Sequence, residues 1–460
     1  MDNNNNGSFR KVIGVFGGIS LVAGMTIGSG VYYLNAYVLQ RVDMSLGWSI
    51  VCWIIGGVVS ILGGLCFAEL GAERPVAGGN TIYLGEAYTP ALGFLNGFLG
   101  FILTGSGSIA SLALAAVTAF QGVWGLNTVE LKLIAIALIV VLTVINVFGV
   151  QGASYLQNVT MVLRVVPLVL IIVVGFTMGT QSPDLSLTTP ANASGKGISG
   201  MITVVGYATF ASLWAYEGWE NLNTVAEEMR NPKKDLPLAI IISIGFITLI
   251  YTLFQLAVYK VLPYDTITQM AGSENNIYLG NEVAQRTMGN VGTTIVLVGM
   301  TIGILGTLNG DVLVFPRTYY AMSKEGYFPK MFQHIDKRGI PLEATIASSA
   351  ISIFLVIFNS LQSLTDMLIF VSAVINCLTI AAVLVYRKKY PNLERPYKVW
   401  GGAVTVVIAI ILYGVLLVNE FVSNPKSAII GVLITLAGLI VYAYFKKKNG
   451  GQEYKGEGLE

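Results

Sequence analysis

The sequence predicts an all-α integral membrane protein with about twelve transmembrane helices. Apolar residues make up 54% of the 460 positions and charged residues 11%, whereas soluble domains are roughly 25% charged. The apolar stretches reach the ~20 residues that a helix needs to cross a ~30 Å hydrocarbon core. Two of these stretches are interrupted by glycine and polar residues at membrane depth.

Each predicted span is read from a continuous apolar stretch. The spans cover residues 14–38, 47–70, 84–120, 131–150, 155–179, 198–226, 237–262, 290–322, 342–359, 364–386, 400–419 and 425–445. The third and eighth spans are longer than a bilayer requires, so we expect them to tilt or to extend beyond the membrane.

Lysine and arginine are distributed unequally between the two sides of this arrangement. With both termini placed inside, nineteen of the 27 basic residues fall in inner segments and six in outer ones. Basic residues accumulate on the cytoplasmic side of membrane proteins, so we expect a multi-pass protein of the cell membrane with cytoplasmic termini. Residues 1–13 form the inner N-terminal segment, which lacks a cleavable signal pattern, and 446–460 form the inner tail.

The interrupted spans are the first, at GMTIGSGVYYL, and the sixth, at FASLWAYEGWENLN. A separation of five spans is typical of transporters built from inverted repeats, in which broken helices hold substrate at the midplane. We therefore predict a five-plus-five inverted-repeat fold with broken helices 1 and 6. Its repeats would cover residues 14–179 and 198–386, followed by two extra C-terminal helices in 400–445.

The two interruptions offer opposite ends of the peptide dipole. At Gly28, Ser29 and Gly30 the lack of two side chains exposes backbone amides at a half-helix N-terminus, which favours an anion such as a carboxylate. The break near Trp214–Gly218 would present carbonyl oxygens to an ammonium group. An α-amino acid satisfies both. The alternative is that Gly24 and Gly28 form a close helix-packing face.

Several stretches resemble one known family. GMTIGSGVYYL is similar to the first-helix motif of the amino acid–polyamine–organocation transporters. The stretch WAYEGWENLNTVAEEMRNPKKDLPLAI resembles the sixth helix and following loop of the L-type amino acid transporter branch. Two further likenesses are NGDVLVFPRTYYAMSKEGYFP, at the end of helix eight, and ERPYKVWG, before helix eleven. The resemblance implies the inverted-repeat fold and alternating access by a bundle of helices 1, 2, 6 and 7.

The resemblance also assigns roles to individual residues. It implies that Ser29 and Gly30 donate amides to the substrate carboxylate, and that Thr26, Trp214 and Ala215 offer carbonyls to the amine. Trp214 occupies the position of an aromatic gate that is usually phenylalanine in the L-type branch, so it would narrow the pocket. The alternative is that the Trp214 ring only packs in the protein core or at the membrane interface. Tyr251 is a further pocket residue by resemblance.

Arg164 is a charge in the middle of the fifth span, where it needs a partner or a cavity. It resembles a position that is lysine in many relatives, near the place where sodium-coupled relatives hold a cation. Because arginine effectively keeps its proton, the resemblance implies a substitute for the coupling cation and favours exchange over proton symport. A structural ion pair or a snorkelling side chain is the alternative.

Polar residues near the breaks are additional candidates. Glu217 and Glu220 lie at i and i+3, so they share one helix face. Either carboxylate would neutralise the substrate amine, pair with Arg164 or titrate during transport. The alternative is that Glu220 lies at the cytoplasmic entrance, in contact with water and without a special function. Thr104 and Ser108 recur at helical spacing in the third span, where they would line a pocket or serve close packing.

Signatures of other function classes are missing. The sequence has no P-loop, HExxH, GxSxG or paired CxxC motif, so we expect no enzyme, cofactor or metal site. Basic clusters border spans and indicate no nucleic-acid binding. The segment 121–130 contains no cysteine, whereas animal L-type relatives bond a heavy subunit there, so we expect no disulfide-linked heavy subunit. We predict a sodium-independent exchanger of small neutral L-amino acids such as alanine, serine or threonine. The alternative is a proton- or exchange-coupled carrier of cationic amino acids or amines.

Overall fold

The computed structural model describes residues 13–28, 30–75, 79–148, 165–273, 278–336 and 340–455. Within these ranges every regular element is a helix, apart from one isolated parallel bridge between Ile13 and Met229. The prediction of an all-α protein is confirmed.

The first half of the chain contains a broken span followed by long helices. The broken span consists of α1 (Val15–Thr26) and α2 (Gly30–Arg41), whose axes differ by 54°. The elements that follow are α3 (Leu46–Glu73), α4 (Asn80–Ala87), α5 (Pro90–Leu99), the π-helical η1 (Gly100–Thr104), α6 (Gly105–Trp124), α7 (Thr128–Phe148) and α9 (Val166–Met178). The predicted span 155–179 is described only from residue 165 onward.

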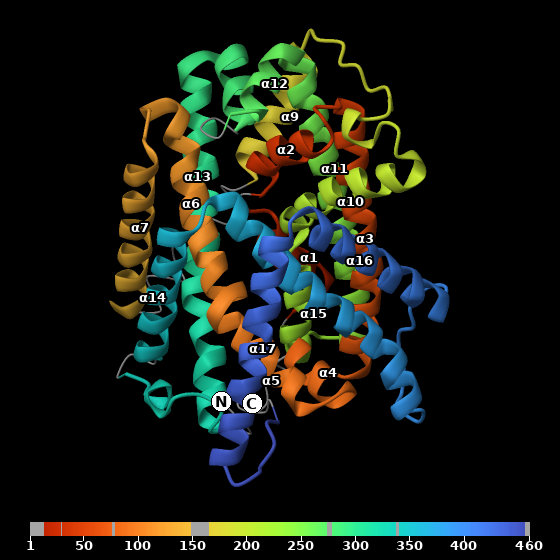
Figure 1. Ribbon diagram of the computed structural model, residues 1–460, viewed down its shortest axis with the longest axis vertical. Helices are drawn as coiled ribbons and strands as arrows, with labels where there is room; N and C mark the ends of the chain where they lie inside the picture. Colours follow the sequence, from red (N-terminus) through yellow and green to blue (C-terminus); the bar gives the residue numbers. More distant parts are fainter. Residues whose placement is uncertain are drawn as a thin grey trace, which may run out of the picture.

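The second half repeats a broken span near its start. It comprises the short η2 (Ala191–Ala193), α10 (Gly197–Tyr216), the 3₁₀ helix η3 (Trp219–Glu228), α11 (Pro232–Val261), α12 (Tyr264–Ala271), α13 (Leu279–Lys324), η4 (Lys330–Gln333), α14 (Leu342–Phe358), α15 (Leu361–Lys389), α16 (Ala403–Ser423) and α17 (Pro425–Lys448). The long α13 is bent at Gly289, where φ is 64°. In Figure 1, α6, α7, α13, α14 and α17 run along the long axis of the molecule, and α15 and α16 cross it obliquely.

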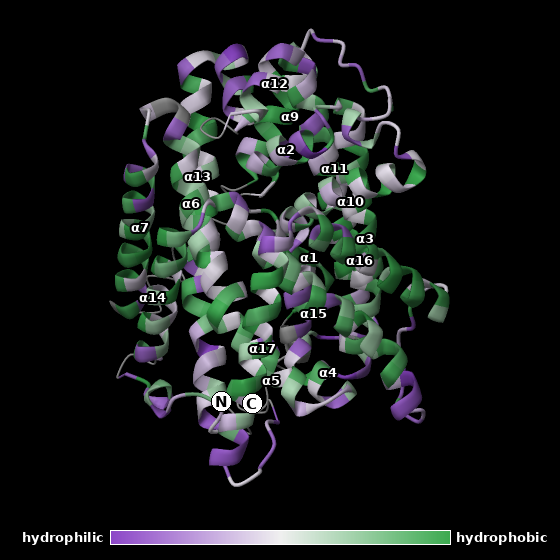
Figure 2. Cartoon of the chain, viewed as in Figure 1, coloured by the Kyte–Doolittle hydropathy of each residue, from purple (hydrophilic) through white to green (hydrophobic). Residues whose placement is uncertain are grey.

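Helix lengths fit a multi-pass membrane protein. Among the described residues, nine helices are long and apolar enough to cross a membrane, and α1 with α2 makes a tenth. Two shorter apolar helices, α9 and α14, coincide with the predicted fifth and ninth spans. Hydrophobic residues dominate the middle of the molecule, and hydrophilic ones gather towards its two ends (Figure 2).

Central and peripheral helices differ in burial. Only 28% of the apolar window in α7 and in α17 is buried within the molecule, against 78% for the third span. The α7 and α17 surfaces therefore face lipid, because a large apolar surface is stable only out of water. Among the central helices, α11 packs on α1 and α3, and α10 packs on α2 and α3.

Two ion pairs fasten the end of α3 to α15 and to the segment that follows it. The Glu69 carboxylate, which is fully buried, accepts hydrogen bonds from Arg387 at 2.7 and 2.8 Å and from the amide of Val399 at 2.7 Å. Glu73 pairs with Arg395 at 3.0 Å. These contacts satisfy charges that would otherwise be costly to bury.

Candidate functional site

The first break lies between the two halves of the first span. Helix α1 ends at Thr26, where Ile27 leaves helical geometry with φ −75° and ψ 90°. Helix α2 begins at Gly30. Among the described residues, a Cβ added to Gly28 would meet only the Thr26 carbonyl oxygen, at 4.0 Å. No other described residue closes on Gly28, which is compatible with the room that a ligand-binding break requires.

The second break follows Tyr216 at the end of α10. Glu217 takes an extended conformation with φ −63° and ψ 150°, and Gly218 has φ 116°. A Cβ on Gly218 would lie 2.8 Å from the carbonyl oxygen of Met25. Position 218 needs glycine for two reasons. A positive φ strains residues that carry a side chain, and the two breaks approach each other too closely here to leave room for one.

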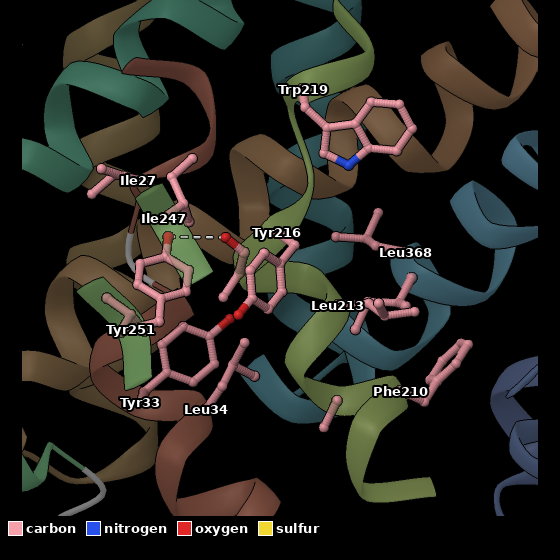
Figure 3. Close-up of a cluster of buried hydrophobic side chains, with 14 of the residues drawn as sticks. Ile27, Tyr33, Leu34, Phe210, Leu213, Tyr216, Trp219, Ile247, Tyr251 and Leu368 are labelled. Carbon is pink, nitrogen blue, oxygen red and sulfur yellow. Dashed lines mark hydrogen bonds between the residues drawn. The ribbon is translucent and has the colours of Figure 1, made fainter. Parts of the chain in front are cut away.

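Tyr251 of α11 connects the breaks. Its hydroxyl lies 3.2 Å from the Thr26 carbonyl oxygen and 3.0 Å from that of Ala215. Figure 3 shows its ring beside that of Tyr216 and close to Ile27. The Tyr251 side chain is fully buried. The carbonyls of Thr26 and Ala215, which are expected to face a substrate amine, thus both lie within hydrogen-bonding distance of the Tyr251 hydroxyl. A substrate ammonium group would have to share these carbonyls with the hydroxyl or displace the hydroxyl from them.

Gly30 has a different neighbour from Gly28. A Cβ on Gly30 would lie 2.9 Å from the Cα of Ala215 and 3.2 Å from its amide nitrogen. The absence of a side chain at Gly30 therefore lets α2 and α10 approach each other, whatever its amide binds. Trp214 is half-buried in the last turn of α10, and its carbonyl accepts the amide of Glu217 at 3.3 Å.

The third span contributes a polar pair that faces α13. The Ser108 hydroxyl donates to Asp311 Oδ2 at 2.6 Å. Thr104 lies one turn earlier, at the end of η1, and is also half-buried. Sequence reasoning missed Asp311, although an acidic residue within the apolar stretch GDVLVFP is itself a signal, because charges at membrane depth are rare and usually functional.

Comparison with known proteins decides the family. The sequence model of the family described as amino acid permease matches residues 13–445 of this chain. The chain belongs to the amino acid permease family. It is thereby a member of the amino acid–polyamine–organocation superfamily that the sequence motifs resemble, and the inverted-repeat transporter fold expected from them is the fold of this family.

Individual relatives of the permease are amino-acid transporters. The b(0,+)-type amino acid transporter 1 of Mus musculus is 30% identical over 445 residues, which are 95% of this chain and 88% of that protein. The serine/threonine exchanger SteT of Bacillus subtilis is 30% identical over 442 residues, 95% and 98% of the two chains. The human cystine/glutamate transporter is 27% identical over 452 residues, 95% and 85%. The permease is accordingly an amino-acid transporter, and its family is not one of enzymes.

The two acidic residues of the second break are placed side by side in the permease. The Glu220 carboxylate accepts the amide of Gly218 at 2.9 Å and so caps the start of η3. Glu217 lies three residues before Glu220 along the chain and forms no ion pair with any residue that the structure describes. Both glutamates are half-buried, so Glu220 is a structural part of the break and not a freely solvated side chain.

Two predicted site residues of the permease cannot be placed. Ser29 and Arg164 both lie outside the described residues. The carboxylate site at the Ser29 amide and the cation-site role of Arg164 therefore stay predictions.

Tyr251→Phe tests the bridge between the breaks. We expect exchange by the permease to slow about fivefold, because loss of one hydrogen bond costs about 1 kcal/mol. The measurement is the initial rate of labelled amino-acid exchange in proteoliposomes. Tyr88→Phe is the matched control, since the Tyr88 hydroxyl donates to the Leu378 carbonyl at 2.9 Å, away from the breaks. Equal rates in the wild type and Tyr251→Phe would show that the bridge has no part in transport.

Proposed function

We propose that this permease is a sodium-independent exchanger of small neutral L-amino acids, such as alanine, serine and threonine, and that it works by alternating access. The observation that carries the proposal is the direct contact of two broken helices, made through Gly218 against Met25 and through Tyr251. Because the two broken helices are in contact, movement of one changes the geometry of the other. One substrate site between them can therefore open to each side of the membrane in turn.

The ligand chemistry follows from the breaks. The start of α2 would receive the substrate carboxylate, because a helix N-terminus favours negative charge. The carbonyls of Thr26 and Ala215 would receive the ammonium group together with Tyr251. Trp214, half-buried at the end of α10, would close over a small side chain. The serine/threonine exchanger among the relatives supports this substrate class.

One observation favours a second candidate, a carrier of cationic amino acids. Among the described residues, Asp311 forms no ion pair, and its side chain accepts a hydrogen bond from Ser108 alone. A carboxylate at membrane depth without a cation favours a positively charged ligand. This candidate predicts that lysine or arginine is transported in preference to serine.

We propose that both termini are cytoplasmic and that no disulfide-linked heavy subunit is needed. The three cysteines support the second point, because Cys52, Cys66 and Cys377 lie within α3 and α15 as free thiols. Their helical, membrane-embedded positions leave no thiol of the described chain in an outer loop.

Counterflow in proteoliposomes tests the exchange mechanism. Vesicles preloaded with unlabelled serine should take up labelled serine at least about tenfold faster than empty vesicles, and removal of sodium should have no effect. Vesicles preloaded with arginine test the second candidate. Accumulation in empty vesicles under a proton gradient, as fast as in loaded ones, would rule out exchange. Preference for arginine over serine would replace the first candidate with the second.

A further inference from the structure

A buried ion pair joins α2 to α15 at the end of α2 that lies away from the breaks. Arg41, the last residue of α2, donates to the Asp366 carboxylate at 2.7 Å, and both side chains are almost fully buried. Arg41 also donates to the Tyr207 carbonyl of α10 at 3.0 Å, and its guanidinium lies 3.9 Å from the centre of the Tyr207 ring. Glu420 of α16 lies beside this pair. We call Arg41, Asp366 and Glu420 the outer cluster, because this end faces the outside when the termini are cytoplasmic.

The two carboxylates of the outer cluster have different surroundings. Asp366 accepts hydrogen bonds from Arg41 and, at 3.0 Å, from the Asn424 side chain. Glu420 is 0% exposed, and neither of its carboxylate oxygens accepts a hydrogen bond from a described residue. The Arg41 Nε–H also has no acceptor among the described residues. Glu420 therefore lacks the hydrogen bonds that a buried carboxylate anion needs.

The charges of the outer cluster do not balance if both acids are ionised. One guanidinium then faces two carboxylates, and the other polar groups beside Glu420 are the amide of Asn424 and the phenol of Tyr207. Neither of these groups supplies a positive charge. An unpaired anion held out of water costs so much free energy that the acid takes up a proton instead. The charge balance thus favours a proton on Glu420 and leaves Asp366 as the counter-charge of Arg41.

A solvent-accessible cavity ends next to the outer cluster without reaching its carboxylates. The cavity has a volume of about 720 Å³, and its lining includes Arg41, Gln362 and Ser423. Neither Asp366 nor Glu420 lines it. Gln362 and Ser423 lie about one helical turn from these two acids along α15 and α16. Separation of α2 from α15 would therefore admit water to both carboxylates.

We propose that Glu420 is a proton-binding site that couples opening of the outer side to external pH. In the structure, the Arg41–Asp366 pair joins α2 to α15 and α10 packs on α15 and α16, and Glu420 holds one proton. When the substrate site opens outward, α2 moves away from α15, water enters, and Glu420 releases that proton to the outside. This inference rests on the proposed function, because alternating access is the movement that opens the outer cluster.

The proton on Glu420 regulates exchange without driving it. Glu420 takes the proton from the outside when the cluster closes and returns it to the outside when the cluster opens, so no net proton crosses the membrane. The closed state binds one proton more than the outward-open state, so external acid stabilises the closed state and external alkali the open one. External substrate binds only the open state, and its apparent affinity falls with the fraction of molecules that are open.

Uptake of labelled L-serine by intact cells with constant internal pH tests the proposal. The external half-saturation concentration of the wild type should rise about threefold or more as external pH falls from about 8 to about 6. Glu420→Gln keeps the shape of the side chain but cannot ionise, so it should give one value throughout, close to the wild-type value at low pH. The matched control is Glu282→Gln in the first turn of α13. Glu282 is half-buried and already paired with Arg286 at 2.7 Å, so this variant should keep the wild-type response.

Infrared spectroscopy of the purified full-length permease detects the proton directly. At about pH 7 an ordinary glutamate is ionised. The difference spectrum between the wild type and Glu420→Gln, both without substrate, should nevertheless contain the carbonyl band of a protonated carboxylic acid. Because this measurement needs no transport, it remains informative when a variant is inactive.

The outcomes separate the two proposals. A wild-type half-saturation that does not depend on external pH overturns the proton-linked opening, and so does a wild-type pH response in Glu420→Gln. Absence of the protonated-acid band overturns the proton on Glu420. Each of these results leaves the exchange mechanism standing if serine counterflow is observed. A protonated-acid band in a wild type that shows no counterflow overturns the proposed function and leaves the proton site standing.

Discussion

Replacing Gly218 with alanine is expected to abolish most transport. The new Cβ would lie 2.8 Å from the Met25 carbonyl oxygen, in a backbone conformation with φ 116°. Strain and steric overlap together cost about 2–4 kcal/mol, which the molecule would relieve by moving the two breaks apart. Because the breaks form the proposed substrate site, the exchange rate should fall at least about tenfold. Counterflow in proteoliposomes measures this directly.

A glycine elsewhere in the same bundle provides the control. Gly245 lies in α11, and a Cβ added there would meet no atom of the described residues within 4 Å. Alanine favours a helix by about 0.5–1 kcal/mol over glycine. Gly245→Ala should therefore retain wild-type exchange. Full activity in Gly218→Ala would mean that the contact between the breaks is unimportant and would remove the main support for the proposed mechanism.

Replacing Glu69 with alanine is expected to cause the largest loss of stability. The Glu69 carboxylate is fully buried and accepts three hydrogen bonds, two from Arg387 and one from the amide of Val399. Its removal leaves Arg387 and that amide without their acceptor, and breaking a buried pair costs about 3–5 kcal/mol. The unfolding temperature of the detergent-solubilised protein should fall clearly in a fluorescence-monitored melt.

An exposed ion pair distinguishes this effect from a general loss of charge. Lys233 and Glu394 form a pair at 3.0 Å whose side chains are mostly in solvent. Such pairs contribute little because water screens them, so Glu394→Ala should melt at the wild-type temperature. If Glu69→Ala and Glu394→Ala melt together, the junction of α3 and α15 does not stabilise the fold as the buried geometry indicates.

Membrane embedding and the positions of the breaks could be predicted from the sequence. Continuous apolar stretches have only one stable environment, and glycine with polar residues inside two of them marks where helical hydrogen bonding stops. The first break lies between the end of α1 at Thr26 and the start of α2 at Gly30, as expected. The second lies at Glu217 and Gly218, within the predicted Trp214–Gly218 stretch. These features depend on residues close together in the chain, so local pattern is sufficient to find them.

The partners within the candidate site could not be predicted in this way. Tyr251 joins carbonyls that are 225 and 36 residues away, and Ser108 donates to Asp311 across 203 residues. Gly30 is a predicted position for a ligand amide, and the sequence did not show that its missing side chain also permits close contact with Ala215. Helical periodicity identifies the face that a residue occupies and not the helix that will cover it.

The sequence by itself determined the environment of this protein, its helical spans and the places where two of them are interrupted. Only the tertiary structure decided which carbonyls, hydroxyls and charges meet, and that Arg41 at the far end of α2 pairs with Asp366, 325 residues away. The physical reason is that hydropathy acts on each segment independently. Hydrogen bonds and ion pairs, in contrast, require two groups within about 3 Å, and that distance is set by how all the helices pack together.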